Sequence, residues 1–136
     1  MTTTDFLQLI PHRPPFLFVD EVMEHDTDRI VTRKQVEPDA AFFQGHYPGN
    51  PIMPGVLLCE CAFQAGAILL AQQLDDPTGA PVVTRIKDAK FKRPVRPGQT
   101  LTVEVVIGER MDDVYFMTGR ISADGHAAAR VEFACA

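Results

Sequence analysis

Two segments near the start of the chain have the composition of β-strands and are separated by a short polar turn. Residues 16–25 (FLFVDEVMEH) and 29–36 (RIVTRKQV) are rich in β-branched and aromatic side chains, and the intervening Asp-Thr-Asp has the chemistry of a hairpin turn. We therefore expect a pair of antiparallel strands. A short helix over residues 2–10 is expected before them, and the prolines of PHRPP end it.

The second half of the chain carries four further strand patterns. In residues 101–109, hydrophobic and polar positions alternate, which places Leu101, Val103 and Val105 on one face. Asp124-Gly125, a strong hairpin signal, joins the last two segments. Strands are therefore expected over residues 82–93, 101–109, 113–122 and 126–136.

Between the two groups of strands lies a segment that is apolar on nearly every face. It starts directly after Pro54, a residue suited to the first turn of a helix, and residues 56–74 carry a single charge, Glu60. This length could cross a membrane. However, three glutamines also interrupt the segment and no basic residues flank it, so a buried central helix is the better interpretation and no membrane partner is expected.

The order of two strands, one long helix and four strands predicts an α+β fold in which an antiparallel sheet wraps around the helix. No repeat or linker divides the sequence, so residues 1–136 are expected to form one domain. One sheet cannot cover a helix that is apolar on nearly every side. A second subunit is the economical cover for the remainder, and the pattern therefore predicts a dimer.

The composition is that of an ordinary globular protein, with 46% hydrophobic and 23% charged residues. A net charge of −5 argues against a nucleic-acid partner and requires a local basic patch for any anionic one. Cys59, Cys61 and Cys135 lack the spacing of a zinc site and indicate small core residues in a reducing compartment. The N-terminus lacks a signal-peptide pattern, which favours a cytoplasmic location.

Glu60 is the first candidate for chemistry. A carboxylate inside an apolar helix is costly to bury as a free anion, so it must be paired, hydrated or protonated. Gln64 follows one helical turn later on the same face, where its amide can orient the carboxyl group. The alternative is that Glu60 lies at the rim of the fold and pairs with an arginine.

The loop before the helix, GHYPGNPIMPG (45–55), holds the second candidate, His46. A lone loop histidine usually has no special role, but three prolines stiffen this loop and leave the side chain few positions. Gly55 and Val56 begin the helix, where backbone N–H groups are unpaired and carry partial positive charge. A base, an acid and an N–H donor so close together suit proton abstraction next to a carbonyl group.

Five basic residues within ten positions contrast with the acidic composition of the chain. A solvated face is the ordinary explanation for such a run. Because the run opposes the net charge, a docking surface for an acidic partner is favoured over that explanation. The five are Lys87, Lys90, Lys92, Arg93 and Arg96.

Three segments together resemble the FabZ-type β-hydroxyacyl-acyl carrier protein dehydratases of the FabA/FabZ family. They are LIPHRPPFLFVDEV (9–22), FFQGHYPGNPIMPGVLLCECAFQAG (42–66) and DAKFKRPVRPG (88–98). The most specific feature is histidine-aromatic-proline followed by Pro-x-Met-Pro-Gly, with an acid fourteen residues after the histidine. The resemblance implies the hotdog fold, in dimers that share active sites and often assemble further into hexamers.

The resemblance also implies roles for individual residues. His46 matches the catalytic histidine and Glu60 the catalytic carboxylate, which come from different subunits in the family. Gly55 matches the glycine whose N–H binds the thioester carbonyl, and Gln64 the glutamine beside the acid. Glutamate at position 60 resembles the simple dehydratases rather than the FabA-type isomerases, which have aspartate. Phe63 stands where alanine is frequent, which implies a reshaped acyl tunnel.

The implied reaction is dehydration of (3R)-3-hydroxyacyl thioesters to trans-2-enoyl thioesters in fatty acid biosynthesis. The substrate is carried on the phosphopantetheine arm of an acidic acyl carrier protein, which would dock on Lys90, Lys92, Arg93 and Arg96. Neither a metal nor a redox cofactor is expected. Two alternatives stay open: a hotdog acyl thioesterase, and a non-catalytic acyl-binding subunit paired with an active paralogue. The pairing of His46 with Glu60 argues against both.

Overall fold

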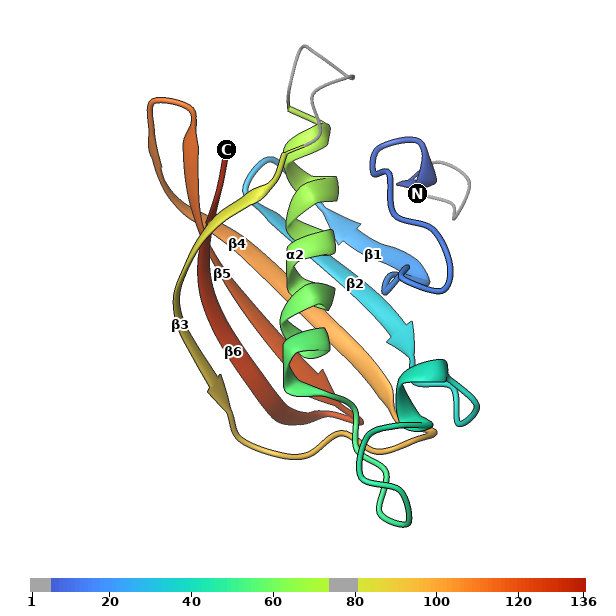
Figure 1. Ribbon diagram of the computed structural model, residues 1–136. Helices are drawn as coiled ribbons and strands as arrows, with labels where there is room; N and C mark the ends of the chain where they lie inside the picture. Colours follow the sequence, from blue (N-terminus) through green and yellow to red (C-terminus); the bar gives the residue numbers. More distant parts are fainter. Residues whose placement is uncertain (1–5, 74–80) are drawn as a thin grey trace.

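The computed structural model describes residues 6–73 and 81–136, and its elements follow the predicted order (Figure 1). A first hairpin is formed by β1 (Glu21–His25) and β2 (Arg29–Gln35). A short 3-10 helix, η1 (Ala41–Phe43), and a loop then lead into the long helix α2 (Gly55–Ala71). The remaining strands are β3 (Val83–Phe91), β4 (Thr100–Met111), β5 (Val114–Ala123) and β6 (His126–Cys135).

The six strands form one antiparallel sheet in the order β1-β2-β4-β5-β6-β3. The sheet curls around α2, so that the helix lies in the hollow of its concave face (Figure 1). This arrangement confirms the expected α+β architecture and the hotdog fold. Strands β1 and β3 are the two edges, because each pairs with one neighbour.

The hairpins form where the turn residues predict them. Asp124 and Gly125 have φ angles of 48° and 84°, as a two-residue turn with both central residues left-handed requires, and β5 pairs with β6 on either side of them. The first strand begins at Glu21 rather than at residue 16. Residues 16–18 instead bond to a side chain of α2, described below. The expected N-terminal helix lies partly outside the described residues; Phe6 and Leu7 are helical.

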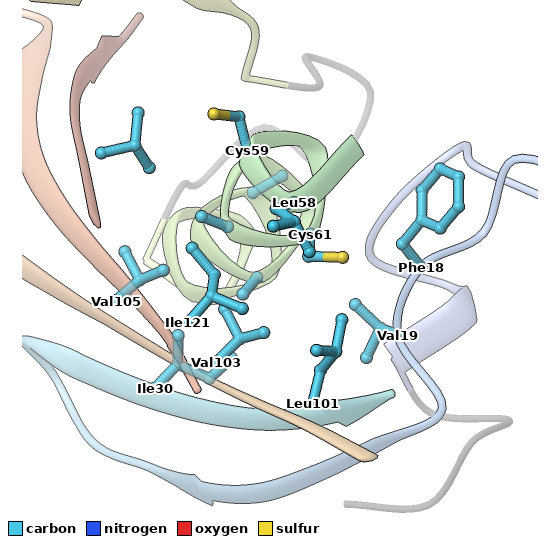
Figure 2. Packing of buried hydrophobic residues seen from close by; sticks show 14 of the residues in the cluster. Phe18, Val19, Ile30, Leu58, Cys59, Cys61, Leu101, Val103, Val105 and Ile121 are labelled. Atoms are coloured by element: carbon cyan, nitrogen blue, oxygen red, sulfur yellow. The ribbon is translucent and has the colours of Figure 1, made fainter. Parts of the chain in front are cut away.

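The core lies between the concave face of the sheet and α2. Figure 2 shows Val103, Val105 and Ile121 of the sheet gathered beneath the helix, where all three are buried. Cys59 and Cys61 project from opposite sides of α2 (Figure 2), as their spacing predicts. All three cysteines are buried and free, which confirms that they are core residues rather than a disulfide framework.

One flank of α2, the side from which Cys61 projects, faces the N-terminal segment of the same chain (Figure 2). Phe6, Ile10, Phe18 and Val19 are all buried there, and this dark-blue segment runs alongside the helix in Figure 1. Val56 is the only residue of α2 classed as exposed, at 73%. Most of α2 is therefore buried within the described chain, so burial of the helix does not by itself require the predicted dimer. In the described part of the chain, no helix is long and apolar enough to cross a membrane.

Candidate active site

The loop that carries His46 projects past the N-terminal end of α2 (Figure 1). Its turn is closed by a hydrogen bond from the Asn50 N–H to the Tyr47 carbonyl oxygen, at 3.0 Å. Tyr47 has a positive φ of 54° and Gly49 one of 91°. Tyr47 therefore holds a left-handed conformation that few non-glycine residues adopt, and the tight turn between Tyr47 and Asn50 maintains it.

The ring of His46 is oriented by a bond within this loop. Its Nδ1 lies 2.9 Å from the carbonyl oxygen of Ile52. Because a carbonyl oxygen can only accept, Nδ1 must carry the hydrogen, and in the neutral ring Nε2 is then the basic nitrogen. The Tyr47 ring packs against the imidazole with its centroid 4.8 Å away at an angle of 89°. The half-buried His46 is thus set in one tautomer, with Nε2 available for chemistry.

Gly55 is the first residue of α2 and lies under the ring of Phe91 from β3. A Cβ atom at position 55 would lie 2.8 Å from Phe91 Cε1, closer than side chains tolerate. Pro54 precedes the helix and gives no side-chain cap, so the N–H groups of Gly55 and Val56 remain unpaired within the described chain. The absence of a side chain at position 55 therefore lets Phe91 approach the helix N-terminus.

A cavity of about 530 Å³ opens at this helix end. Its lining combines Gly55, Val56 and Phe91 with two of the basic residues, Lys92 and Arg93. The predicted oxyanion donors and part of the predicted docking surface are thus parts of one hollow.

Glu60 lies on α2 and is held by Gln64 one turn later. Gln64 Nε2 donates to Glu60 Oε2 at 3.0 Å and to the Phe16 carbonyl oxygen at 2.9 Å. Gln64 Oε1 accepts from the Phe18 N–H at 2.7 Å. Gln64 is fully buried, and both hydrogens of its amide are used in these bonds. The predicted orientation of Glu60 by Gln64 is therefore present, and the same amide ties residues 16–18 to the helix.

The rim alternative for Glu60, an ion pair with an arginine, is absent from the described residues. The side chain that Glu60 faces across the fold is His12, whose Nε2 lies 3.7 Å from Glu60 Oε2. No hydrogen bond or ion pair between described residues joins His46 to Glu60. Within the described chain, His46 contacts its own loop, whereas Glu60 contacts Gln64 and His12.

The basic residues of the predicted docking surface lie in different environments. Lys92 and Arg93 are exposed at the end of β3, whereas Arg96 donates through Nη1 to Asn50 Oδ1 at 2.7 Å. The Met53 N–H also donates to the Val95 carbonyl oxygen at 2.7 Å. These two bonds attach the connection between β3 and β4 to the loop that carries His46. Lys90 is exposed and lies 4.0 Å from Asp88 of the same strand.

Three residues of this region had no role in the sequence-based interpretation: His12, Asn50 and Phe91. Each lies inside a motif that was singled out, PHRPP, GHYPGNPIMPG or DAKFKRPV. Their contacts join segments far apart in the sequence, so spacing could not reveal them. Among the described residues, no group of three or more His, Cys, Asp or Glu side chains is placed to hold a metal ion. Phe63 packs edge-on against Phe133, with ring centroids 4.9 Å apart.

Comparison with known proteins assigns the family. Residues 10–132 match the family model of the FabA-like domain. A protein from Oenococcus oeni named 3-hydroxyacyl-[acyl-carrier-protein] dehydratase FabZ is 40% identical over 133 residues, covering 97% of this chain and 96% of that protein. A protein of the same name from Thermomicrobium roseum is 44% identical over 126 residues, covering 92% of this chain and 85% of that protein.

Solved structures share the fold. The dehydratase heterocomplex ApeI:P from Xenorhabdus doucetiae has a TM-score of 0.79 at 13% identity, covering 96% of this chain and 88% of that one. A hypothetical thioesterase with coenzyme A from Streptococcus pneumoniae has a TM-score of 0.67 at 15% identity, covering 85% of this chain and 82% of that one. Such low identities support the fold alone, whereas the closer sequence matches decide the family. The chain belongs to the FabA-like family and, within it, to the FabZ type.

Proposed function

We propose that the protein dehydrates (3R)-3-hydroxyacyl thioesters of an acyl carrier protein to trans-2-enoyl thioesters in fatty acid biosynthesis. The relatives from Oenococcus oeni and Thermomicrobium roseum are named as dehydratases of 3-hydroxyacyl-[acyl-carrier-protein], which supports this reaction class. The observation that supports it most directly is the orientation of His46, because the bond to Ile52 leaves Nε2 as the basic nitrogen. A base of fixed tautomer is what removal of a proton next to a thioester carbonyl requires.

In this proposal, His46 Nε2 takes a proton from C2 of the substrate. The electrons of that C–H bond form the C2–C3 double bond as the C3–O bond breaks. Protonated Glu60 gives its proton to the departing hydroxyl group, which leaves as water. The proton on His46 then returns to Glu60 through solvent, so that both groups are restored. Each positioned group contributes roughly 10²–10⁴-fold to the rate.

The start of α2 supplies the third part of the site. Negative charge develops on the thioester oxygen as the C2 proton leaves, and in this proposal the Gly55 N–H donates a hydrogen bond to that oxygen, with the Val56 N–H beside it. Preorganised donors of this kind contribute about 3 kcal/mol each to transition-state stabilisation. The cavity that contains Gly55 and Phe91 gives the thioester a place to lie. No metal or redox cofactor enters the proposed reaction.

A second copy of the chain is part of the proposal, because the family resemblance implies that His46 and Glu60 act from different subunits. Consistent with this, no hydrogen bond or ion pair among the described residues joins the two. The edge strand β3 offers the surface for it. Among the described strands, β3 pairs with β6 alone, so the hydrogen-bonding groups on its outer edge have no strand partner there. Ile86 and Phe91 of β3 are 54% and 53% exposed. A large exposed apolar surface on an unpaired edge is typical of a strand that associates with another chain. We propose a homodimer that pairs each His46 with the partner subunit's acid, and a trimer of such dimers as the larger assembly.

The acyl carrier protein is the proposed macromolecular partner. Lys92 and Arg93 at the mouth of the cavity would attract an acidic carrier and bring its phosphopantetheine arm to Gly55. Lys90 extends the same surface along β3. A cytoplasmic location is proposed with this partner, because free thiols buried in the core are stable in a reducing compartment.

The experiment that tests the function is turnover of a (3R)-3-hydroxyacyl carrier protein by the purified protein. The enoyl product is followed by its absorbance and free thiol by a colorimetric reagent. Enoyl product without free thiol supports the proposal. Free thiol without enoyl product identifies a thioesterase, the activity for which the Streptococcus pneumoniae neighbour is named. Neither product, with the acyl carrier protein retained on the protein, identifies the non-catalytic alternative.

A further inference from the structure

His12 lies beside the carboxyl group of Glu60, although the reaction proposed above gives it no role. It belongs to the PHRPP segment, which the sequence marks only as the end of a helix. Its side chain is 26% exposed and that of Glu60 is 20% exposed, so both groups are largely shielded from solvent. The two groups come from separate elements of the fold, the N-terminal segment and α2.

The backbone around His12 is held in place by its neighbour in the sequence. The guanidinium group of Arg13 donates to the carbonyl oxygens of Leu7 at 2.8 Å, Ile10 at 2.9 Å and His12 at 2.6 Å. Ile10 is buried against the core. Three hydrogen bonds and an apolar anchor therefore hold the backbone that carries His12 in place without any contact to Glu60.

The environment of the ring identifies its tautomer. His12 Nδ1 is buried and has no hydrogen-bond partner among the described residues. An N–H group buried without an acceptor is costly, whereas a bare lone pair costs less. The neutral ring therefore carries its hydrogen on Nε2, the nitrogen that lies 3.7 Å from Glu60 Oε2. Contacts around catalytic groups are often this long before substrate binds and shorten in the reacting complex.

Two N–H groups thus face the same oxygen of Glu60 from different elements. Gln64 Nε2 lies 3.0 Å from Oε2 within α2, and His12 Nε2 lies 3.7 Å from it in the N-terminal segment. Glu60 Oε1 accepts no hydrogen bond from any described residue. A proton on this carboxyl group belongs on Oε1, because a proton on Oε2 would face two N–H groups.

We propose that His12 is a positioning residue that, together with Gln64, holds Glu60 by Oε2 and so directs the proton-bearing Oε1 to the leaving hydroxyl group. This inference rests on the proposed dehydration, in which Glu60 is the acid. It assigns no proton transfer to His12 itself. Its effect is on the orientation of Glu60, so it acts on the chemical step and not on substrate binding.

Three substitutions separate positioning from packing. The side-chain nitrogen of glutamine reaches close to the place of Nε2, whereas that of asparagine reaches only the place of Nδ1. Leucine keeps apolar bulk but donates nothing. We expect His12→Leu and His12→Asn to lower kcat about 10-fold with KM unchanged, because one donor to the carboxyl group is lost. His12→Gln should recover most of that loss.

The matched control is His25→Leu, the same substitution at the exposed end of β1, which should leave kcat and KM unchanged. Thermal unfolding confirms that each variant is folded. If His12→Leu does not fold, comparison of His12→Gln with His12→Asn is sufficient to test the role, because both side chains donate through an amide nitrogen and that nitrogen lies in a different place in each. Equal kcat for these two variants, or a loss that appears in KM instead, would overturn the positioning role.

Wild-type protein and Glu60→Gln are measured in the same assay. Active wild type, inactive Glu60→Gln and normal kcat in all three His12 variants reject this inference but leave the proposed function standing. Wild type that forms no enoyl product, or Glu60→Gln that keeps full activity, rejects the proposed function and the role of His12 with it.

Discussion

The Nδ1 atom of His46 donates a hydrogen bond to the carbonyl oxygen of Ile52, 2.9 Å away and six residues later. The bond closes the proline-rich loop on itself and fixes both the plane and the tautomer of the ring. The stiffness that the prolines give to the backbone therefore extends to the imidazole. A base held in this way enters the reaction without first losing rotational freedom.

This relationship predicts that two substitutions of His46 will differ in stability but not in activity. Asparagine can keep the bond to the Ile52 carbonyl oxygen, because its amide nitrogen reaches the place of Nδ1, but it supplies no base. Alanine loses both. We expect His46→Asn and His46→Ala each to lower kcat by roughly 10²–10⁴-fold, and His46→Asn to keep more of the wild-type thermal stability. Steady-state kinetics and thermal unfolding test the pair. Turnover near the wild-type rate in His46→Asn would show that Nε2 is not the base.

Gln64 carries a different prediction, because its amide holds segments together as well as facing Glu60. Gln64→Leu keeps the volume but leaves the Phe18 N–H and the Phe16 carbonyl oxygen without partners in a buried place. We expect it to lower the free energy of unfolding by about 2–4 kcal/mol, measured by urea denaturation. Glu60→Gln, which changes the acid and leaves those two bonds intact, is the control and should cost about 1 kcal/mol or less. A Gln64→Leu variant of wild-type stability would contradict this bridging role.

The sequence predicted those elements of the fold whose structure depends on residues close together in the chain. Alternation in β4, the Asp124-Gly125 turn and the apolar run of α2 each have a local cause, and each prediction is confirmed. It was insufficient for the N-terminal segment. Residues 16–18 have strand composition, yet the buried Gln64 takes their N–H and carbonyl groups, a contact across 46 to 48 positions that no local pattern records.

The same limit applies to the site. His46, Gly55, Glu60 and Gln64 could be singled out because a polar group or a glycine stands out in its own surroundings. His12 could not, because its significance comes from Glu60, which approaches it only in the folded chain. The five basic residues looked alike in the sequence, whereas the structure engages Arg96 with Asn50 and leaves Arg93 exposed.

That difference between Arg93 and Arg96 makes the carrier-docking proposal testable. Arg93→Glu should raise KM for an acyl carrier protein substrate about 10-fold, because it places a negative charge opposite an acidic partner. It should leave turnover of a short soluble thioester unchanged. Arg96→Glu should impair both substrates, since it also breaks the bond to Asn50 in the loop that carries His46.

Asn50→Ala separates the two effects of Arg96, because it breaks the same bond without changing the charge. It should impair the soluble thioester about as much as Arg96→Glu does. An equal loss on both substrates in Arg93→Glu would count against a docking surface at the end of β3.

The contact between Gly55 and Phe91 predicts a loss that a second substitution can repair. In Gly55→Ala the new methyl group would lie 2.8 Å from Phe91 Cε1, so the exposed ring must move or the helix N-terminus must shift. We expect a lower kcat, by about 10-fold or more, because the Gly55 N–H loses its place relative to the substrate. Phe91→Leu added to Gly55→Ala should restore part of the activity by making room, while Phe91→Leu alone is the reference. A double variant less active than Gly55→Ala would contradict the steric explanation.

Cys61 makes stability depend on pH in a predictable direction. Complete burial raises the pKa of its thiol to about 12 from an ordinary value of 9.0, because the thiolate would lose its solvation. The folded chain therefore keeps this proton at a pH where the unfolded chain releases it, so the stabilisation is present below about pH 9 and is lost as pH rises toward 12. Between about pH 8 and pH 10 the wild type should lose about 1.4 kcal/mol more of its free energy of unfolding than Cys61→Ala, by urea denaturation. Equal losses in the two proteins would show that the thiol ionises as readily in the folded chain as in the unfolded one.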